Sequence, residues 1–222
     1  MVNPILVALD VPSLEHALAL VDVVGDAAGG VKIGMELFDA EGPRAVEALA
    51  ERGLFLDLKL HDIPTTVRRT VAALAPLGPA MLNVHALGGR AMLEAANETK
   101  GKTKILAVTI LTSLGDGDLK EIGLPPAAEA VPMLAALARE AGCDGVVCAP
   151  ADVAAVRAVA PAPFLIVTPG IRPAGSPADD QVRTMTPRQA LDAGADYLVV
   201  GRPITRAPDP RAAAESILRE LA

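Results

Sequence analysis

Eight short apolar runs divide the chain at fairly even intervals, and stretches rich in Ala, Leu, Glu and Arg separate them. Strand–helix alternation repeated eight times is the pattern of a closed (β/α)8 barrel, a TIM barrel in the α/β class. The predicted strands are Ile5–Asp10, Gly30–Gly34, Leu54–Lys59, Met81–His85, Lys104–Thr109, Gly145–Cys148, Phe164–Thr168 and Tyr197–Gly201.

The stretches between these runs are predicted as helices. Ser13 begins the first of them and is a suitable N-cap. A doubly wound open sheet is the structural alternative, but it would usually show a Gly-rich first turn, and Val11-Pro12-Ser13-Leu14 follows Asp10 instead. The expected helices are 13–24, 39–50, 65–75, 90–98, 131–141, 151–159, 187–193 and 210–221.

Composition supports one domain over residues 1–222. Hydrophobic residues make up 51% of the 222 positions and aromatic residues only 2%, so we expect an aliphatic core of the kind that buries parallel strands on both faces. A net charge of −7 argues against a nucleic-acid or anionic-membrane partner.

No apolar stretch approaches the roughly 20 residues of a membrane span, and we expect a soluble cytoplasmic protein.

Two connections are longer than a barrel needs. They are Thr112–Ala130 and Pro169–Thr186, and both contain glycine and proline. Each follows a strand, so each is predicted on the face where barrel enzymes have their active sites. Both are therefore candidate lids.

Polar side chains gather at the carboxyl ends of most predicted strands, which meet at one mouth in a barrel. Asp57 and Lys59 are two apart in a strand, so their side chains project to the same side. A buried charge is costly unless it is paired, so this pattern is more typical of a site than of a core. The polar residues in or just after the strands include Asp10, Lys32, Asp57, Lys59, Asn83, His85, Thr112, Ser113, Arg172 and Arg202.

The eighth strand also carries a phosphate signal. Gly201 allows close approach of backbone N–H groups, and Arg202 can form a bidentate pair with phosphate oxygens. Barrels commonly bind phosphate with the loops after strands seven and eight. The position of this Gly-Arg pair therefore predicts a phosphate-binding end of the site.

Segments along nearly the whole chain, in order, resemble the orotidine 5′-phosphate decarboxylase family. The central one is Asp57-Leu58-Lys59-Leu60-His61-Asp62-Ile63-Pro64-Thr65-Thr66-Val67. The others are Leu9-Asp10, Val31-Lys32-Ile33-Gly34, 109–113, 168–172, Asp179-Asp180-Gln181 and 194–204. The central run is specific to the superfamily that includes this family. The further match at Gln181 and Gly201-Arg202 narrows the resemblance to the decarboxylase itself.

The resemblance implies decarboxylation of orotidine 5′-monophosphate (OMP) to uridine 5′-monophosphate (UMP) and carbon dioxide, the last step of de novo UMP synthesis. It implies no metal, no organic cofactor, and a homodimer with its active sites near the interface. Lys32, Asp57, Lys59 and Asp62 then correspond to an alternating charge network, with Asp62 and Thr66 contributed across the interface.

The remaining site residues are also implied by the resemblance. Asp10 and Lys32 correspond to ribose contacts, and either Thr112 or Ser113 to the pyrimidine contact. Substrate contacts are further implied for Pro169 and Arg172 in the closing loop, and phosphate contacts for Gln181, Gly201 and Arg202.

The implied reaction explains why a lysine is needed. Loss of carbon dioxide from C6 leaves an electron pair in the ring plane, and without a cofactor as electron sink its stabilisation must be electrostatic. We expect the Lys59 ammonium to stabilise this carbanion and then to donate the proton. Asp57 and Asp62 would keep Lys59 charged and aimed, since opposite charges favour the ammonium form.

Two other functions stay open from the sequence. One is a magnesium-dependent sugar-phosphate decarboxylase or aldolase of the same superfamily, against which Lys32 argues because a metal-binding relative would carry an acidic ligand in that region. The other is a non-catalytic barrel that binds a phosphorylated metabolite. His61 and His85 are expected to be structural, and Cys143 and Cys148 are expected to be free thiols in the core.

Overall fold

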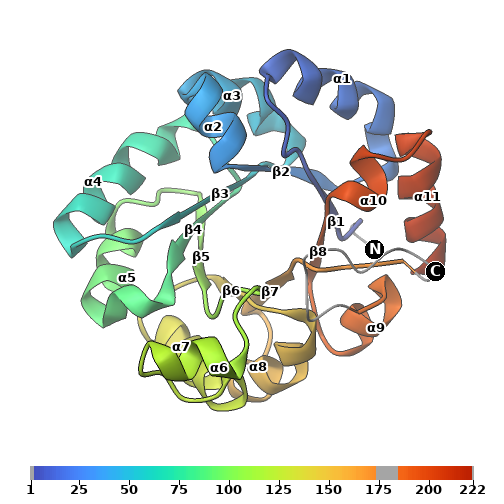
Figure 1. The fold of residues 1–222 in the computed structure, drawn as a ribbon. Coiled ribbons are helices and arrows are strands. Elements are labelled where there is room, and N and C mark those ends of the chain that lie inside the picture. The colour runs from blue at the N-terminus through green and yellow to red at the C-terminus, as the bar shows by residue number, and fades with distance from the viewer. Residues whose placement is uncertain (1–2, 174–184, 222) are drawn as a thin grey trace.

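The computed structural model describes residues 3–173 and 185–221, and these form a closed barrel of eight parallel strands in sequence order. The last strand pairs with the first, which closes the sheet (Figure 1). The strands are β1 (Ile5–Ala8), β2 (Gly30–Gly34), β3 (Phe55–Leu60), β4 (Met81–His85), β5 (Lys104–Val108), β6 (Gly145–Val147), β7 (Leu165–Thr168) and β8 (Tyr197–Val200). The predicted (β/α)8 barrel is confirmed, and every strand lies within two residues of its expected bounds.

Helices surround the barrel and cover its outer face (Figure 1). Ser13 caps the first helix as expected, its hydroxyl oxygen accepting from the backbone N–H of His16. The helices are α1 (Leu14–Val24), α2 (Met35–Glu41), α3 (Pro43–Leu49), α4 (Pro64–Leu74), α5 (Gly89–Glu98), α6 (Asp116–Glu121), α7 (Ala127–Glu140), α8 (Val153–Val159), α9 (Pro187–Asp192), α10 (Arg202–Thr205) and α11 (Pro210–Glu220).

The helices differ from the prediction at three places. The single helix expected over 39–50 is two helices, because Gly42 adopts a φ of 63° that ends α2, and Pro43 begins α3. The long connection 112–130 contains α6 and the start of α7, whose interior accommodates Pro132. The short helix α10, directly after β8, was not predicted.

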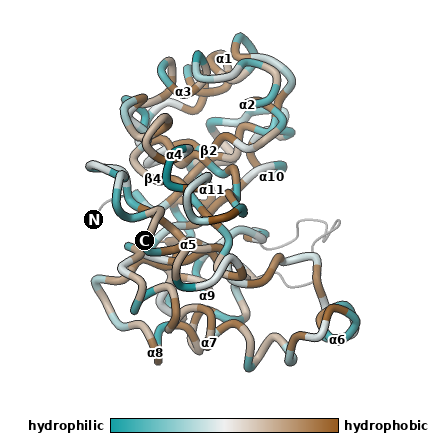
Figure 2. Tube along the Cα trace, turned by 90° about the vertical axis from the view of Figure 1, so that its left-hand side faces the viewer, coloured by the Kyte–Doolittle hydropathy of each residue, from teal (hydrophilic) through white to brown (hydrophobic). Residues whose placement is uncertain are grey.

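The core has two layers, as parallel strands buried on both faces require. Side chains from alternating strand positions fill the barrel, and Phe55 is the one aromatic side chain among its fully buried residues. A second, larger aliphatic layer lies between the strands and the helices. Figure 2 shows hydrophobic residues along the central strands and mixed residues in the helices around them. Cys143 and Cys148 are buried free thiols, as expected, and burial raises the pKa of Cys143 to about 11.

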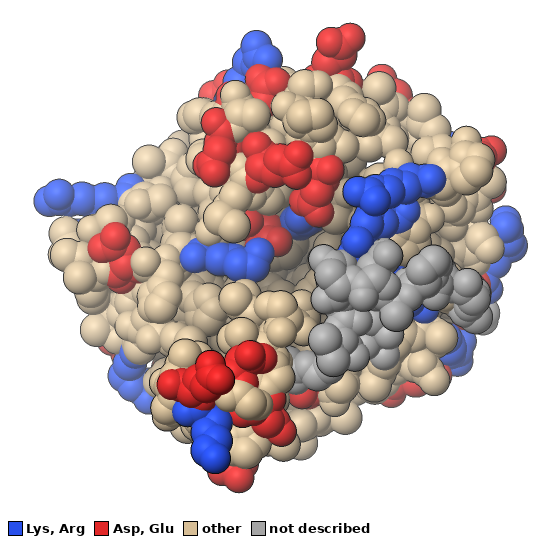
Figure 3. Space-filling view, viewed as in Figure 1, with Lys and Arg blue, Asp and Glu red and all other residues tan. Residues whose placement is uncertain are grey.

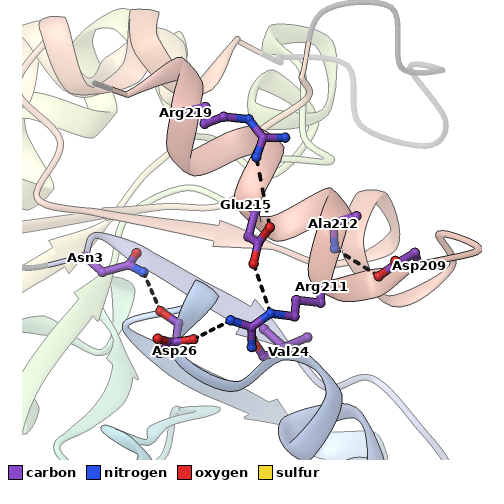
Figure 4. Close-up of polar contacts among 8 residues, drawn as sticks. All are labelled: Asn3, Val24, Asp26, Asp209, Arg211, Ala212, Glu215 and Arg219. Atoms are coloured by element: carbon purple, nitrogen blue, oxygen red, sulfur yellow. Dashed lines mark hydrogen bonds and ion pairs between the residues drawn. The ribbon is translucent and has the colours of Figure 1, made fainter.

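The last helix fastens to the first part of the chain through Arg211 (Figure 4). Its guanidinium donates to Asp26 at 2.8 Å and to Glu215 of the same helix at 2.9 Å. This contact holds the pKa of the Asp26 carboxyl below its usual value. Asp209 caps the same helix by accepting from the backbone N–H of Ala212. Among the described residues, no helix is both long and apolar enough to span a membrane.

Candidate active site

The carboxyl ends of the strands surround a cavity of about 460 Å³. Figure 3 looks onto this face, where acidic and basic side chains border a central hollow. A second cavity, of about 210 Å³ beneath α1, is lined mostly by apolar residues. The larger cavity is lined by Ala8, Asp10, Lys32, Glu36, Phe55, Asp57, Lys59, Thr112, Val147, Pro169, Gly170, Arg172, Val199, Gly201, Arg202, Thr205 and Arg206.

Four charged residues of alternating sign form a chain across one side of this cavity. The Lys32 ammonium lies 2.6 Å from Asp10 Oδ1 and 3.8 Å from Asp57 Oδ2. Lys59 Nζ donates to Asp57 Oδ1 at 2.7 Å. The order is therefore Asp10, Lys32, Asp57, Lys59, with each cation beside at least one carboxylate. The Lys32 side chain is only 8% exposed, so these partners are what makes its burial tolerable.

The chain of charges follows from the positions of three neighbouring strand ends. Lys32 lies in β2 and pairs in register with Phe55 of β3, and Asp10 follows β1. Gly34 gives room for the contact, because a Cβ there would lie 3.3 Å from both Asp10 Oδ1 and Lys32 Nζ. A side chain at this position would press on the ion pair.

Lys59 has an unusual backbone. Among the described residues it is the only non-glycine residue with positive φ, at 53°. The β3–β4 pairing shifts at this point, since Leu56 pairs with Leu82 while Leu60 pairs with Val84. Three residues of β3 thus face only Asn83 of β4. Bulges of this kind re-aim side chains and are frequent next to active sites.

His85 lies beside the lysine end of the charge chain. Its ring stacks on that of His61 with centroids 5.3 Å apart. Burial, helped by His61 and Lys59, lowers the pKa of His85 to about 4. His85 Nδ1 accepts from the backbone N–H of Leu87, which is the hydrogen bonding of a neutral ring. The lowered pKa favours a neutral imidazole at this position.

The opposite side of the cavity is basic. Arg172, Arg202 and Arg206 all line it, after β7 and in the segment that follows β8. Among the described residues, a Cβ at Gly201 would meet only Ala8 Cβ, at the ordinary distance of 3.5 Å, so packing against them does not require a glycine. A glycine here is explained better by a ligand that approaches the backbone.

The base of the predicted lid 169–186 is partly described. Pro169, Gly170 and Arg172 line the cavity, and the Arg172 N–H donates to the carbonyl of Met185 at 2.9 Å. This bond brings the two described ends of the connection together. Gln181, the predicted phosphate contact, lies outside the described residues.

Three predicted residues do not line the cavity of the single chain: Asp62, Thr66 and Ser113. Asp62 Oδ1 accepts from the N–H of Ile63 at 2.6 Å, and Thr66 is exposed in the first turn of α4. Between the two candidates for a pyrimidine contact, Thr112 lines the cavity.

Sequence reasoning missed four residues of this region. Asn83 is one of the strand-end polar residues, but its place in the sequence indicates no role, although its amide bonds both Lys59 and Asp57. Three further residues line the cavity: Glu36 in α2, Thr205 at the end of α10, and Arg206 directly after it. The sequence pattern does not place them at the cavity, because it predicts neither the start of α2 nor α10.

The fold and the charged mouth together define an enzyme of the (β/α)8-barrel class. The family model described as orotidine 5′-phosphate decarboxylase / HUMPS family matches residues 3–217. The orotidine 5′-phosphate decarboxylase of Sphingopyxis alaskensis is 52% identical over 221 residues, covering 98% of each chain. That of Thermobifida fusca is 50% identical over 225 residues, covering 100% of this chain and 97% of the relative. The chain therefore belongs to the orotidine 5′-phosphate decarboxylase / HUMPS family.

Solved structures agree with this assignment. The crystal structure of orotidine 5′-phosphate decarboxylase from Lactobacillus acidophilus superposes with a TM-score of 0.87 at 41% identity, covering 99% of both chains. The orotidine 5′-phosphate decarboxylase from Pyrococcus horikoshii OT3 gives a TM-score of 0.81 at 29% identity, covering 98% of both. The similarity thus extends over the entire barrel.

The neutral state of His85 predicts a pH dependence of stability. Its pKa is about 4 in the folded chain and about 6.5 when unfolded, so the unfolded state binds more protons between these values. This contribution is present above pH 6.5 and is lost as the pH falls toward 4. Urea unfolding of the unchanged chain should therefore show a steeper loss of stability over this window than His85→Asn. Parallel curves for the two proteins would contradict the assignment.

Proposed function

We propose that the protein decarboxylates OMP to UMP and carbon dioxide, the last step of de novo UMP synthesis. The observation that carries the proposal is the ion-paired Lys59 in the barrel mouth, 2.7 Å from Asp57, in a chain that belongs to this family. A cavity of about 460 Å³ with cations at both sides suits a small anionic substrate.

Lys59 has the central role in the proposed chemistry. The electron pair left at C6 lies in the ring plane, where the ring π-system cannot delocalise it. A preorganised ammonium beside C6 stabilises that charge at no reorganisation cost during the reaction. The same group then gives its proton to C6, which completes UMP. Asp57 holds the ammonium in place, and Lys32 holds Asp57 from its other side.

The rest of the substrate is assigned to the flanks of the cavity. We place the ribose against Asp10 and Lys32, and the pyrimidine against Thr112. The phosphate belongs on the basic side, with Gly201 and Arg202. Pro169, Arg172 and Gln181 complete the proposed contacts from the connection after β7. Phosphate binding far from C6 lowers the barrier if it drives closure of that connection over the substrate.

The proposed enzyme is a homodimer of single-domain chains. Asp62 and Thr66 lie outside the cavity of their own chain, which supports their role as residues given to the partner's site. Ile63, next to Asp62, is an apolar side chain with 66% of its surface exposed, as an interface residue would be in an isolated chain. A cytoplasmic location fits the two free cysteines, and no nucleic-acid or membrane partner is proposed.

The reaction is proposed to proceed without metal or organic cofactor. A divalent cation in the magnesium-dependent alternative would need the carboxylates of the mouth as ligands. Lys32 already lies between Asp10 and Asp57, at 2.6 and 3.8 Å, so a cation there would meet the ammonium. Among the described residues, no group of three acidic, His or Cys side chains could hold a metal.

The first test is the ultraviolet absorbance of OMP mixed with the purified chain, in excess chelator and without added cofactor. We expect the absorbance to fall as stoichiometric UMP forms. The control is the same chain in magnesium without chelator, which should give the same rate. No turnover by folded, dimeric protein would contradict the proposal and favour the magnesium-dependent alternative.

Lys59→Ala removes both the stabilising charge and the proton donor. We therefore expect kcat/KM to fall by more than the roughly 10²–10³-fold that loss of one oxyanion-hole donor causes. Steady-state kinetics on OMP measures the change, with circular dichroism to show that the variant is folded. A loss below about tenfold would remove Lys59 from the mechanism.

Mixing two inactive variants tests the shared site. If Asp62 serves the partner's Lys59, a heterodimer of Lys59→Ala and Asp62→Ala has one intact site and one with both changes. Random reassortment should then restore about a quarter of the unchanged activity, since half of the dimers carry one good site of two. If Asp62 serves its own chain, no heterodimer site is intact, and the mixture stays as inactive as its parents.

A further inference from the structure

Asn83 is a fully buried amide that holds both members of the Lys59–Asp57 pair. Its Oδ1 accepts the backbone N–H of Lys59 at 2.7 Å, and its Nδ2 donates to Asp57 Oδ1 at 2.6 Å. The side chain is 0% exposed and does not line the cavity. Any effect on a ligand must therefore pass through its two partners.

The backbone explains why this amide is needed. Between the pairs Leu56–Leu82 and Leu60–Val84, Asn83 is the one β4 residue opposite the bulge. The N–H of Lys59 therefore bonds to a side chain in place of a main-chain carbonyl of the ladder. Lys59 has a φ of 53°, a region that a residue with a Cβ enters only when its surroundings hold it there. The bond from Asn83 is a direct restraint on that conformation.

We propose that Asn83 is the positioning residue for Lys59. It holds the left-handed backbone from which the lysine side chain departs, and it fixes the carboxylate oxygen that receives the ammonium. The inference rests on the proposed function, because the ammonium has to lie beside C6 for the reaction. A reacting group displaced by about 1 Å can lose on the order of 10²-fold in rate.

A purely structural role would look different. In a regular ladder, the N–H groups of β3 would bond to main-chain carbonyls of β4. Position 83 could then hold an apolar side chain, whose burial costs less free energy than burial of an amide. Both polar ends of Asn83 instead contact residues of the charge chain. The amide is thus placed where the position of Lys59 depends on it.

The test compares three variants with the unchanged chain. Asn83→Leu removes both hydrogen bonds at similar volume, and Asn83→Asp keeps an acceptor for Lys59 but cannot donate to Asp57 when both carboxylates are charged. The matched control is Thr103→Val, which removes a buried 2.9 Å hydrogen bond to Pro79 at the opposite end of the barrel. For each protein, calorimetry gives the number of UMP sites per chain, and steady-state assays give kcat and KM for OMP.

For both Asn83 variants we expect kcat to fall by about 10²-fold per site. The number of UMP sites and KM should stay near those of the unchanged chain, because the phosphate and ribose contacts lie elsewhere. Thr103→Val should keep its kcat. Misfolding would lower the number of sites and would leave kcat per site unchanged, so the two effects are distinct.

Two results would overturn the inference. If either folded Asn83 variant keeps the kcat per site of Thr103→Val, Asn83 does not position the lysine, while the proposed function stands. If Asn83→Leu fails to fold, Asn83→Asp, which has nearly the same shape, decides the question. No turnover by the unchanged chain would overturn the proposed function and this inference with it.

Discussion

The Asp57 carboxylate is the point on which the site depends. Its Oδ1 accepts from Lys59 and from Asn83, and its Oδ2 is the oxygen nearest to Lys32. An ionised carboxylate only accepts, and its two oxygens offer about four lone-pair directions, so one such group can accept both hydrogen bonds and still form an ion pair with Lys32 at 3.8 Å. These three partners come from β2, β3 and β4, and Asp57 therefore links three neighbouring strands at their functional ends. Without it, the buried Lys32 ammonium would keep only Asp10 among the carboxylates that the structure describes.

The position of Lys59 illustrates where the fold accepts strain. A left-handed backbone at a residue with a Cβ costs roughly 1–2 kcal/mol of conformational free energy. A typical hydrogen bond stabilises the folded state by about 1 kcal/mol. The bond from Asn83 thus offsets much of the conformational cost of the 53° φ. Such outliers persist when the surrounding structure determines them, and they gather at active sites. A regular strand at this position would avoid that conformational cost.

The sequence predicted the parts of this molecule that depend on local pattern. All eight strands could be recognised because each is a short apolar run, and the carboxyl ends of parallel strands share one face. Part of the charge chain could also be predicted. Asp57 and Lys59 are two residues apart in a strand, so their side chains are expected on the same side. Alternation could not reveal the bulge, because the bulge involves a hydrogen bond with Asn83, 24 residues further along the chain. The break between α2 and α3 depends on the conformation of one glycine, and α10 is only four residues long. Glu36 of α2 and Thr205 of α10 line the cavity from these elements, and the sequence therefore does not predict them.

The hydrogen bonds of Lys59 also bear on the proposed dimer. An ammonium has three donors, and among the described residues Lys59 Nζ donates only to Asp57. Its side chain is 32% exposed and lines the cavity, so the ammonium has two donors to spare for further partners. A single carboxylate restrains an ammonium from one side only, so the lysine side chain can still change its rotamer. A second carboxylate from a partner would restrain it from the other side and leave one donor for the reacting carbon. In this arrangement, association of two chains completes the electrostatic field that the barrel mouth of each chain begins.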